Sequence, residues 1–530
     1  MTVVDKAWER LGSQLGSAEF VAMLRRLAGG EPADGQAVFH ALYSDRRGMS
    51  ALAPDALPFV LALARDPALP AREELVLALH MLVGCARSQP EERIAPGWPS
   101  AWRACRAAAE PLVSDPDPTV RRWAVSLVER RGLLLDRLRA EPEPALRIRL
   151  LLRLGRVAAP SDDEARAAVA AEADDDAPAL RLAALRALNR LDPDGAAGRV
   201  DQLVEVFTGP TTPSSVDLLW NPLAEEYPVE LADLILPAAE ELPGEVAARF
   251  TARLARTGAP EFRVAALDAA WRVLAMRPSA GPGLIPAAGE LLDDPDPRIR
   301  TRAAHLLAVL ARRAAPFADR LFALLDDRSG DDLLDGDTAD FAHWALARMG
   351  DPRVMPGLVQ KLTELEEEQG RGYIGGDPRR PEPYDALIAL AEHADVLRPA
   401  LTERVRAGRR GADVLAVWDG LSTAGDPSAT PDPESVVGRL RRMPQHYQPW
   451  QDLRPQRAAM AAVAALSRRG PLPPEVRAAV ECVLALDRRL SDKADYRAVL
   501  DDERLRGMLE RALRGEAVRM PALSGSLPFS

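Results

Sequence analysis

The sequence predicts an all-α protein built as an α-solenoid, a HEAT-like superhelix of antiparallel helix pairs. One helix-forming design recurs along the 530 residues at a spacing that suits helix pairs. The composition is 47% apolar but only 5% aromatic, which favours close packing of helices rich in Ala and Leu. At about 35–45 residues for each pair, we expect roughly 11–13 pairs.

The stretch from Asp115 to Gly132 shows this design most completely. Asp117 suits the N-cap, because its carboxylate can accept a hydrogen bond from a free backbone N–H of the first turn. Pro118 follows at the first helical position, where a missing N–H costs nothing. Apolar residues then recur on one face, and Gly132 is expected to end the helix. These apolar residues are Val120, Ala124, Leu127 and Val128.

The motif that repeats is Pro, any residue, a large apolar residue and Arg. It begins at Pro118, Pro144, Pro178, Pro260, Pro297 and Pro474. The successive spacings are 26, 34, 82, 37 and 177 residues. The longer spacings fit several units whose intermediate copies have diverged, so the period indicates an α-solenoid.

Two segments resemble known repeat families. Leu291-Leu-Asp-Asp-Pro-Asp-Pro-Arg-Ile-Arg-Thr-Arg-Ala-Ala304 resembles the HEAT repeat, whose second helix opens with such a run. Ala345-Leu-Ala-Arg-Met-Gly-Asp-Pro-Arg-Val-Met-Pro-Gly-Leu358 resembles the bacterial HEAT-like repeats first named for phycobilisome lyases. The resemblance is clearest over residues 100–365. It implies an armadillo-like fold and binding of a protein partner.

The motifs divide the chain into five predicted segments. Residues 1–96 form capping and early helical pairs, and residues 97–365 form the HEAT-like repeats. An insertion loop follows at 366–383, where acidic residues give way to glycines and prolines. Residues 384–518 form degenerate helical repeats, and residues 519–530 form a flexible tail.

Composition excludes several functional classes. The net charge of −11 argues against wholesale binding of nucleic acid. Arginine supplies 65 of the 68 positive charges, which we interpret as the codon bias of a GC-rich bacterium such as an actinomycete. The start lacks a secretory apolar region, and the longest apolar run, near residues 75–86, is too short to span a bilayer. We therefore expect a soluble, cytoplasmic monomer.

Sites for cofactors and metals are not expected. Gly370-Arg-Gly-Tyr-Ile-Gly375 is a literal GxGxxG, but it lies between an acidic helix and a proline-rich run, not between a strand and a helix. The histidines are scattered singly, and the three cysteines form no CxxC. The loop at 366–383 has a second interpretation, as a segment that closes on a partner. Its candidate contacts are Tyr373, Arg379 and Arg380.

Charge is concentrated in residues 121–156, which hold ten arginines against four acids. One interpretation is structural: arginines pair with acids of the neighbouring turn. The other is a basic groove that docks an acidic partner surface. Its candidate contacts are Arg121, Arg122, Arg147, Arg149, Arg153, Trp98 and Trp102.

We therefore predict a non-enzymatic scaffold or regulator that binds a protein or peptide along a concave solenoid face. The alternative comes from a different class, because HEAT-like repeats also occur in chromophore lyases and DNA-base glycosylases. A glycosylase would use tryptophans that flank a carboxylate. The segment 98–156 offers Trp98, Trp102 and Trp123 around Asp115 and Asp117.

Overall fold

The structure is a computed structural model whose contacts divide the chain into two units. Unit 1 comprises Met1–Arg199 and Thr211–Glu225, and unit 2 comprises Val200–Pro210 and Glu226–Ser530. Each unit is described by itself. The described residues are 17–29, 35–44, 46–69, 72–89, 91–209, 231–331, 334–359, 378–381, 383–407, 415, 432–443, 453–491, 493, 495–521 and 523.

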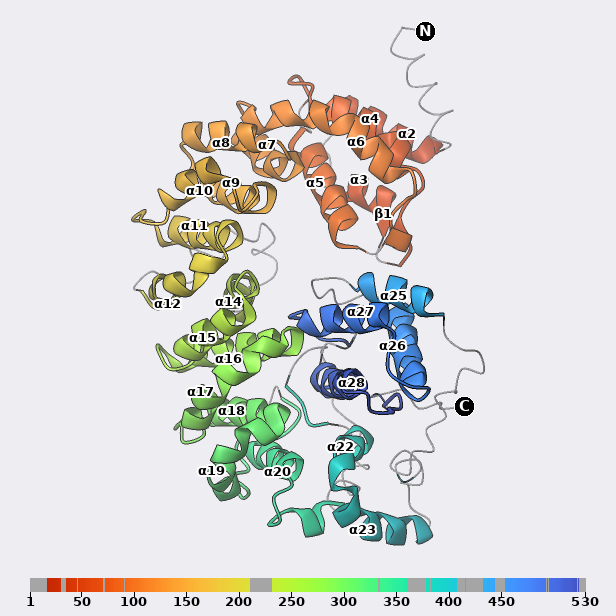
Figure 1. The fold of residues 1–530 in the computed structure, drawn as a ribbon. Helices are drawn as coiled ribbons and strands as arrows, with labels where there is room; N and C mark the ends of the chain where they lie inside the picture. Colours follow the sequence, from red (N-terminus) through yellow and green to blue (C-terminus); the bar gives the residue numbers. More distant parts are fainter. Residues whose placement is uncertain are drawn as a thin grey trace. The chain divides into compact units, whose positions relative to one another are not determined.

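Unit 1 is a series of helix pairs with one short hairpin (Figure 1). Its α-helices are α2 (Ala18–Ala28), α3 (Gly35–Leu42), α4 (Ala53–Ala64), α5 (Arg72–Ser88), α6 (Trp98–Ala109), α7 (Pro118–Ala124), α8 (Arg131–Ala140), α9 (Pro144–Val157), α10 (Asp163–Ala170) and α11 (Pro178–Leu191). Its short 3-10 helices are η1 (Glu91–Arg93), η2 (Glu110–Ser114), η3 (Val125–Leu127) and η4 (Asp194–Arg199). Strands β1 (Tyr43–Ser44) and β2 (Gly48–Met49) pair antiparallel.

Each repeat of unit 1 contributes a first and a second helix. The first helices are α4, α6, α8 and α10, and the second helices are α5, α7, α9 and α11. Second helices of neighbouring repeats contact one another: α5 with α7, α7 with α9, and α9 with α11. We call the surface that they form the second-helix face. The predicted all-α repeat fold is confirmed.

The predicted helix start at Asp117 is confirmed. Its side chain accepts a hydrogen bond from the backbone N–H of Thr119 at 2.9 Å, and Pro118 begins α7. Asp296 caps α18 in the same way, with the N–H of Arg298 at 2.9 Å. Each of these carboxylates satisfies a backbone N–H that the helix leaves without a partner.

The predicted helix end at Gly132 is wrong. Helix α7 ends at Ala124, η3 follows, and the chain is extended at Val128. Gly132 lies in the first turn of α8. The whole predicted apolar stripe is nonetheless buried, together with Val125. A continuous helix would point neighbouring residues in different directions, and leaving the helix early lets Val125, Leu127 and Val128 all enter the core.

An arginine–carboxylate ladder joins successive repeats. Arg121 of one repeat donates from Nε and Nη2 to the Glu141 carboxylate of the next, both at 3.1 Å. Its Nη1 also donates to the carbonyls of Asp115 and Pro116, which form the turn of its own repeat. Glu141 in turn accepts from the N–H of Glu143, two residues onward. Each such arginine therefore connects two turns.

The same pairing recurs at corresponding positions in both units. Further rungs are Arg72–Asp115 and Arg147–Glu172 in unit 1, and Arg263–Asp294 and Arg300–Asp327 in unit 2. Except for Glu172, these carboxylates also accept a hydrogen bond from the backbone N–H two residues onward. One acid thus shapes its own turn and receives the arginine of the preceding repeat.

Unit 2 continues the repeats and ends in a compact group of helices. Its α-helices are α12 (Val200–Thr208), α14 (Leu231–Glu240), α15 (Gly244–Leu254), α16 (Pro260–Met276), α17 (Gly281–Leu291), α18 (Pro297–Leu310), α19 (Ala318–Ala323), α20 (Thr338–Met349), α22 (Pro383–Ala389), α23 (Ala394–Arg406), α25 (Pro433–Arg441), α26 (Arg454–Ser467), α27 (Pro474–Ala485) and α28 (Tyr496–Leu513). Short 3-10 helices are η5 (Pro278–Ala280), η6 (Ala311–Phe317), η7 (Met355–Gly357) and η9 (Ala391–His393). Helices α25–α28 share an apolar core.

In unit 2, the second-helix face is contacted by the chain's own C-terminal segment. Here α15 pairs with α16 and α17 with α18, and α16 and α18 are the second helices of these pairs. Helix α28 packs against both of them (Figure 1). Just before it, Arg489 donates from Nε and Nη2 to the carbonyl of Leu274, at 3.1 and 2.8 Å. Glu503 of α28 accepts from Arg348 of α20 at 2.7 Å. This part of the face is therefore occupied within the unit.

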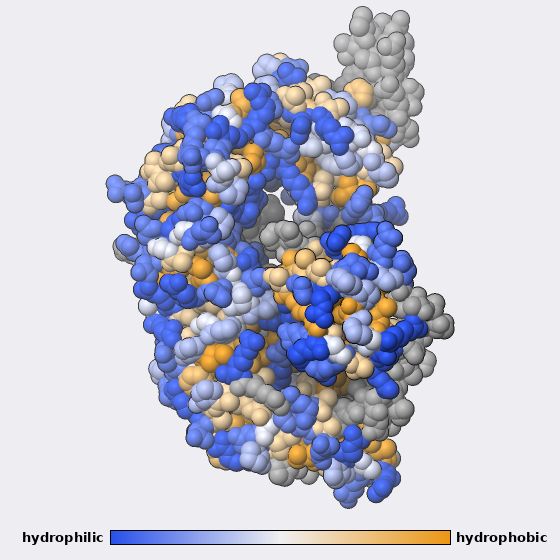
Figure 2. Space-filling model, in the orientation of Figure 1, coloured by the Kyte–Doolittle hydropathy of each residue, from blue (hydrophilic) through white to orange (hydrophobic). Residues whose placement is uncertain are grey.

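The visible surface is mostly hydrophilic, with hydrophobic residues in small separate areas (Figure 2). Of the large hydrophobic side chains that the structure describes, Phe322 and Val396 are the exposed ones. Among the described helices, not one combines the length and the apolarity needed to cross a bilayer.

The ladder predicts a large difference between two arginine substitutions. Arg121→Ala leaves the buried Glu141 carboxylate with Arg137 as its remaining ion-pair partner, so unit 1 should lose about 3 kcal/mol of unfolding free energy. Arg139→Ala removes exposed ion pairs with Asp136 and Glu164 and should cost less than about 1 kcal/mol. Urea unfolding followed by tryptophan fluorescence measures both. Equal shifts of the unfolding midpoint in Arg121→Ala and Arg139→Ala would contradict a stabilising role of the ladder.

A buried histidine predicts acid sensitivity of unit 2. His305 lies between the rings of Trp271 and Phe341, and neither ring nitrogen has a hydrogen-bond partner among the described residues. Burial, with a smaller effect of Arg302, lowers its pKa from 6.5 to about 3. Below pH 6.5 the unfolded chain binds a proton at this histidine and the folded chain does not. The unfolding free energy therefore decreases as the pH is lowered. The loss at pH 5 should be roughly 2 kcal/mol.

Replacing this histidine tests the sign and the size of the effect. His305→Leu should reduce the drop in unfolding free energy between pH 7 and pH 5 by roughly that 2 kcal/mol. His40→Gln, at an exposed histidine, provides the control and should leave the drop unchanged. An identical pH dependence in wild type and His305→Leu would show that His305 is not the group responsible.

Candidate functional site

Four arginines gather on the second-helix face of unit 1. We call Arg87 of α5, Arg122 of α7, and Arg149 and Arg153 of α9 the arginine cluster. Arg149 and Arg153 stand four residues apart, so they lie one above the other on the same side of α9. Hydrogen bonds to three carbonyls of the α7–η3 segment hold the cluster together.

Arg149 is a partly buried cation without a carboxylate. Its guanidinium carbon lies 4.9 Å from the centre of the Trp123 ring, and Nη1 donates weakly to the carbonyl of Arg122 at 3.5 Å. It forms no ion pair with a described residue. Burial and the charge of Arg122 lower its pKa to about 10. Both effects mean that this charge is held at a cost in free energy.

Arg153 repeats this situation one turn later. Its Nε donates to the carbonyl of Val128 at 2.9 Å, and burial and the charge of Arg87 lower its pKa to about 10. Glu129 is the carboxylate whose charge reaches Arg153, but it already forms ion pairs with Arg87 at 3.1 Å and Arg106 at 2.8 Å. The positive charge of the cluster is therefore larger than the negative charge that carboxylates of the described residues bring to it.

Aromatic and polar groups line the base of the cluster. The His80 ring lies 5.2 Å from the Trp123 ring, and its Nδ1 is 2.7 Å from the hydroxyl oxygen of Ser126. Burial, with the charges of Arg149 and Arg87, lowers the pKa of His80 to about 4, so the ring is neutral at pH 7. His80 therefore adds no charge to the cluster.

Two of the arginines predicted as contacts have structural roles. Arg121 and Arg147 are rungs of the ladder and face carboxylates of the next repeat. For these two, the structural interpretation of the charge concentration holds. Arg122, Arg149 and Arg153 instead lie together in the arginine cluster. Arg87 was not predicted, because it lies in α5, outside the segment 121–156 whose charge was counted.

The predicted tryptophans belong to the packing of unit 1. Trp98 begins α6 and is buried, and its ring stacks on that of Trp102 at 6.3 Å with an angle of 4° between the planes. Trp102 packs partly buried against the apolar core. Asp115 is paired with Arg72, and Asp117 caps α7. These four residues of the glycosylase alternative therefore have structural roles, and Trp123, the fifth, is buried beneath Arg149.

The other predicted contacts lie in unit 2. Arg379 pairs with Asp495 at 2.6 Å, and its guanidinium lies 5.3 Å from the Tyr496 ring. Arg380 pairs with Asp335 at 3.2 Å and Asp340 at 3.4 Å. These contacts hold the described residues of the predicted insertion loop, 378–381, against other parts of unit 2. Tyr373 lies outside the described residues.

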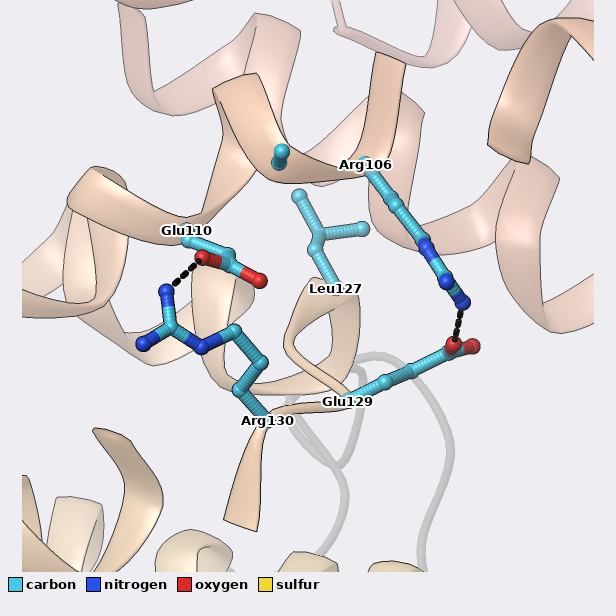
Figure 3. A pocket seen from close by; sticks show the side chains of 6 residues that line it. Arg106, Glu110, Leu127, Glu129 and Arg130 are labelled. Atoms are coloured by element: carbon cyan, nitrogen blue, oxygen red, sulfur yellow. Dashed lines mark hydrogen bonds and ion pairs between the residues drawn. The ribbon is translucent and has the colours of Figure 1, made fainter. Parts of the chain in front are cut away.

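A pocket of about 310 Å³ lies beside the cluster and is lined by Arg106, Ala107, Glu110, Leu127, Glu129 and Arg130. Figure 3 shows its two ion pairs, Arg106–Glu129 and Arg130–Glu110, each at 2.8 Å. The hydrogen bonds from Arg87 and Arg106 outweigh burial and lower the pKa of Glu129. The pocket balances its own charges and offers no unpaired acid or base for catalysis.

The described side chains include no group of three or more His, Cys, Asp or Glu residues that could hold a metal ion. What the site offers chemically is a set of guanidinium groups, two of which, on Arg149 and Arg153, are partly buried. Guanidinium groups suit recognition of carboxylates, because their N–H donors match both oxygens.

Comparison with known proteins returned similarity to solved structures alone. No protein-family model matches the sequence, and no curated protein matches it. The structure of Kap121p bound to Pho4p is 12% identical at a TM-score of 0.35, with 94% of this chain and 49% of that chain covered. This chain thus spans about half the length of Kap121p.

Two shorter solved chains are also similar. An engineered protein is 15% identical at a TM-score of 0.29, with 87% of this chain and 98% of that chain covered. A structure from work on the phosphorylation-controlled interaction between cadherin and beta-catenin is 17% identical at a TM-score of 0.27. The match covers 86% of this chain and 93% of that chain. Likeness at these scores supports no functional assignment.

Proposed function

We propose that this protein is a non-enzymatic interaction scaffold that binds a protein partner through the second-helix face of unit 1. The observation that carries the proposal is the arginine cluster, in which Arg149 and Arg153 are partly buried without a carboxylate partner among the described residues. Leaving a buried cation unpaired costs free energy, and a partner that supplies the counter-charge recovers it.

The contrast between the two units supports this choice of face. In unit 2, α28 already contacts the second helices α16 and α18. The described residues of unit 1 end at Arg199 and include no segment comparable to α28. Repeat proteins commonly use such extended faces to bind other proteins. The expected bacterial origin, cytoplasmic location and monomeric state belong to the same proposal.

Affinity capture with matched variants tests the proposed function. The tagged full-length chain should capture a stoichiometric protein from its native lysate, and Arg149→Gln/Arg153→Gln should lose it because the counter-charge has no cation to meet. Arg103→Gln, which removes one exposed charge from α6, should retain the partner. Capture should weaken at high salt, since the interaction is electrostatic. A partner retained equally by all the variants would place binding elsewhere.

A further inference from the structure

A position in unit 2 matches Arg149 and shows what Arg149 lacks. Arg149 stands five residues after Pro144, the proline that begins α9, and Arg302 stands five residues after Pro297, which begins α18. The Pro, apolar, Arg motif aligns the two helices. The two arginines are therefore equivalent members of their repeats, on second helices in each case.

Arg302 is neutralised by two carboxylates of its own chain. Its Nε donates to Asp268 of the preceding second helix, α16, at 2.7 Å. Its Nη1 donates to Asp331, in the segment after α19, at 2.8 Å. Its side chain is only 6% exposed, so at this repeat position a deeply buried guanidinium is accommodated by two acids.

The preceding helix of Arg149 carries no such acid. Asp268 stands eight residues after Pro260, which begins α16, and the residue eight positions after Pro118 is Ser126. The Ser126 hydroxyl donates to the carbonyl of Trp123 at 2.9 Å and lies against His80. At this distance from the proline, unit 1 therefore has a neutral hydroxyl, on the turn η3 that follows α7, and unit 2 has a carboxylate, within α16.

From this correspondence, resting on the proposed function, the geometry points to the class of partner: a protein helix that presents carboxylates one turn apart to Arg149 and Arg153. For Arg149, the partner supplies from outside the counter-charge that Asp268 and Asp331 supply to Arg302 within unit 2.

Two observations favour a helix as the partner: the spacing of Arg149 and Arg153, and the packing of helix α28 on the second-helix face of unit 2. Arg149 and Arg153 are four residues apart on α9, and carboxylates at i and i+4 of a partner helix have the same separation. In unit 2 the occupant of the second-helix face is itself a helix, α28, whose Glu503 pairs with Arg348. An acidic helix on unit 1 would repeat that arrangement.

The surroundings favour carboxylates over nucleic-acid phosphates. Arg149 and Arg153 are recessed and held against backbone carbonyls, whereas contact with a phosphate backbone requires protruding cations along a track. The nearby Trp123 is buried beneath Arg149 and offers no face on which a base could stack. The chain as a whole carries a charge of −11.

The test measures binding of a labelled alanine-based helical peptide with glutamates at i and i+4 along one face. Fluorescence anisotropy with the full-length chain should detect binding that weakens as salt increases. Arg149→Gln/Arg153→Gln should weaken it at least about ten-fold. Arg103→Gln should change it less than about two-fold, because that charge lies on α6, away from the face.

Ser126→Asp provides the sharpest variant, because it keeps every arginine. The new carboxylate lies beside Arg87, which already donates to the carbonyl of residue 126, and should pair within the chain, so peptide affinity should fall about ten-fold. The melting temperature should rise by a few degrees, since Arg87 and Arg149 then gain a counter-charge. A rise in melting temperature would also show that the lost affinity does not come from unfolding.

Three results would overturn the inference. They are absence of binding by the one-face peptide, equal binding of a peptide with the same glutamates scattered around the helix, and tighter arginine-dependent binding of a DNA duplex. The last would assign the face to nucleic acid. If the peptide fails while lysate capture still depends on Arg149 and Arg153, the partner class is wrong and the proposed function stands. If both fail, the face does not bind partners.

Discussion

The stack depends on one recurring interaction: an arginine near the start of a second helix that reaches the acidic turn of the next repeat. Arg121 shows the geometry, since it binds both the carbonyls of its own turn and the carboxylate of Glu141. That carboxylate also shapes the turn in which it lies. The turn that starts a helix thus also fixes where the neighbouring repeat stacks. Of the corresponding arginines, Arg181 of α11 forms no ion pair with a described carboxylate, and it belongs to the last helix pair of unit 1.

The same chemistry, left incomplete, produces the candidate site. Arg302 is an arginine whose two counter-charges come from the chain, and Arg149 is an arginine at the equivalent position without them. One part of the difference lies eight residues after the proline that begins the preceding second helix, where unit 2 has Asp268 and unit 1 has Ser126. In the function that we propose, binding depends on this missing internal contact, and the cation–π contact with Trp123 holds the unpaired guanidinium.

Local chemistry made much of the fold predictable from sequence. Asp117 predicts the N-cap of α7, and the spacing of apolar residues after Pro118 predicts which residues of this repeat are buried. The sequence was less informative where burial outweighed the local preference of a residue. Gly132 was predicted to end a helix, but it lies in the first turn of α8. Contacts between distant segments were beyond such reasoning. Arg489 binds the carbonyl of Leu274, 215 residues away, and no local pattern encodes that pairing.

Hydrogen–deuterium exchange of the full-length chain, with and without the one-face glutamate peptide, tests the central claim most directly. Exchange should slow in Pro118–Ala124 and Pro144–Val157, the helices that carry Arg122, Arg149 and Arg153, and stay unchanged in Pro260–Met276 and Pro297–Leu310. Slower exchange confined to the unit 2 helices, or none in unit 1, would contradict the claim that unpaired arginines define the binding face.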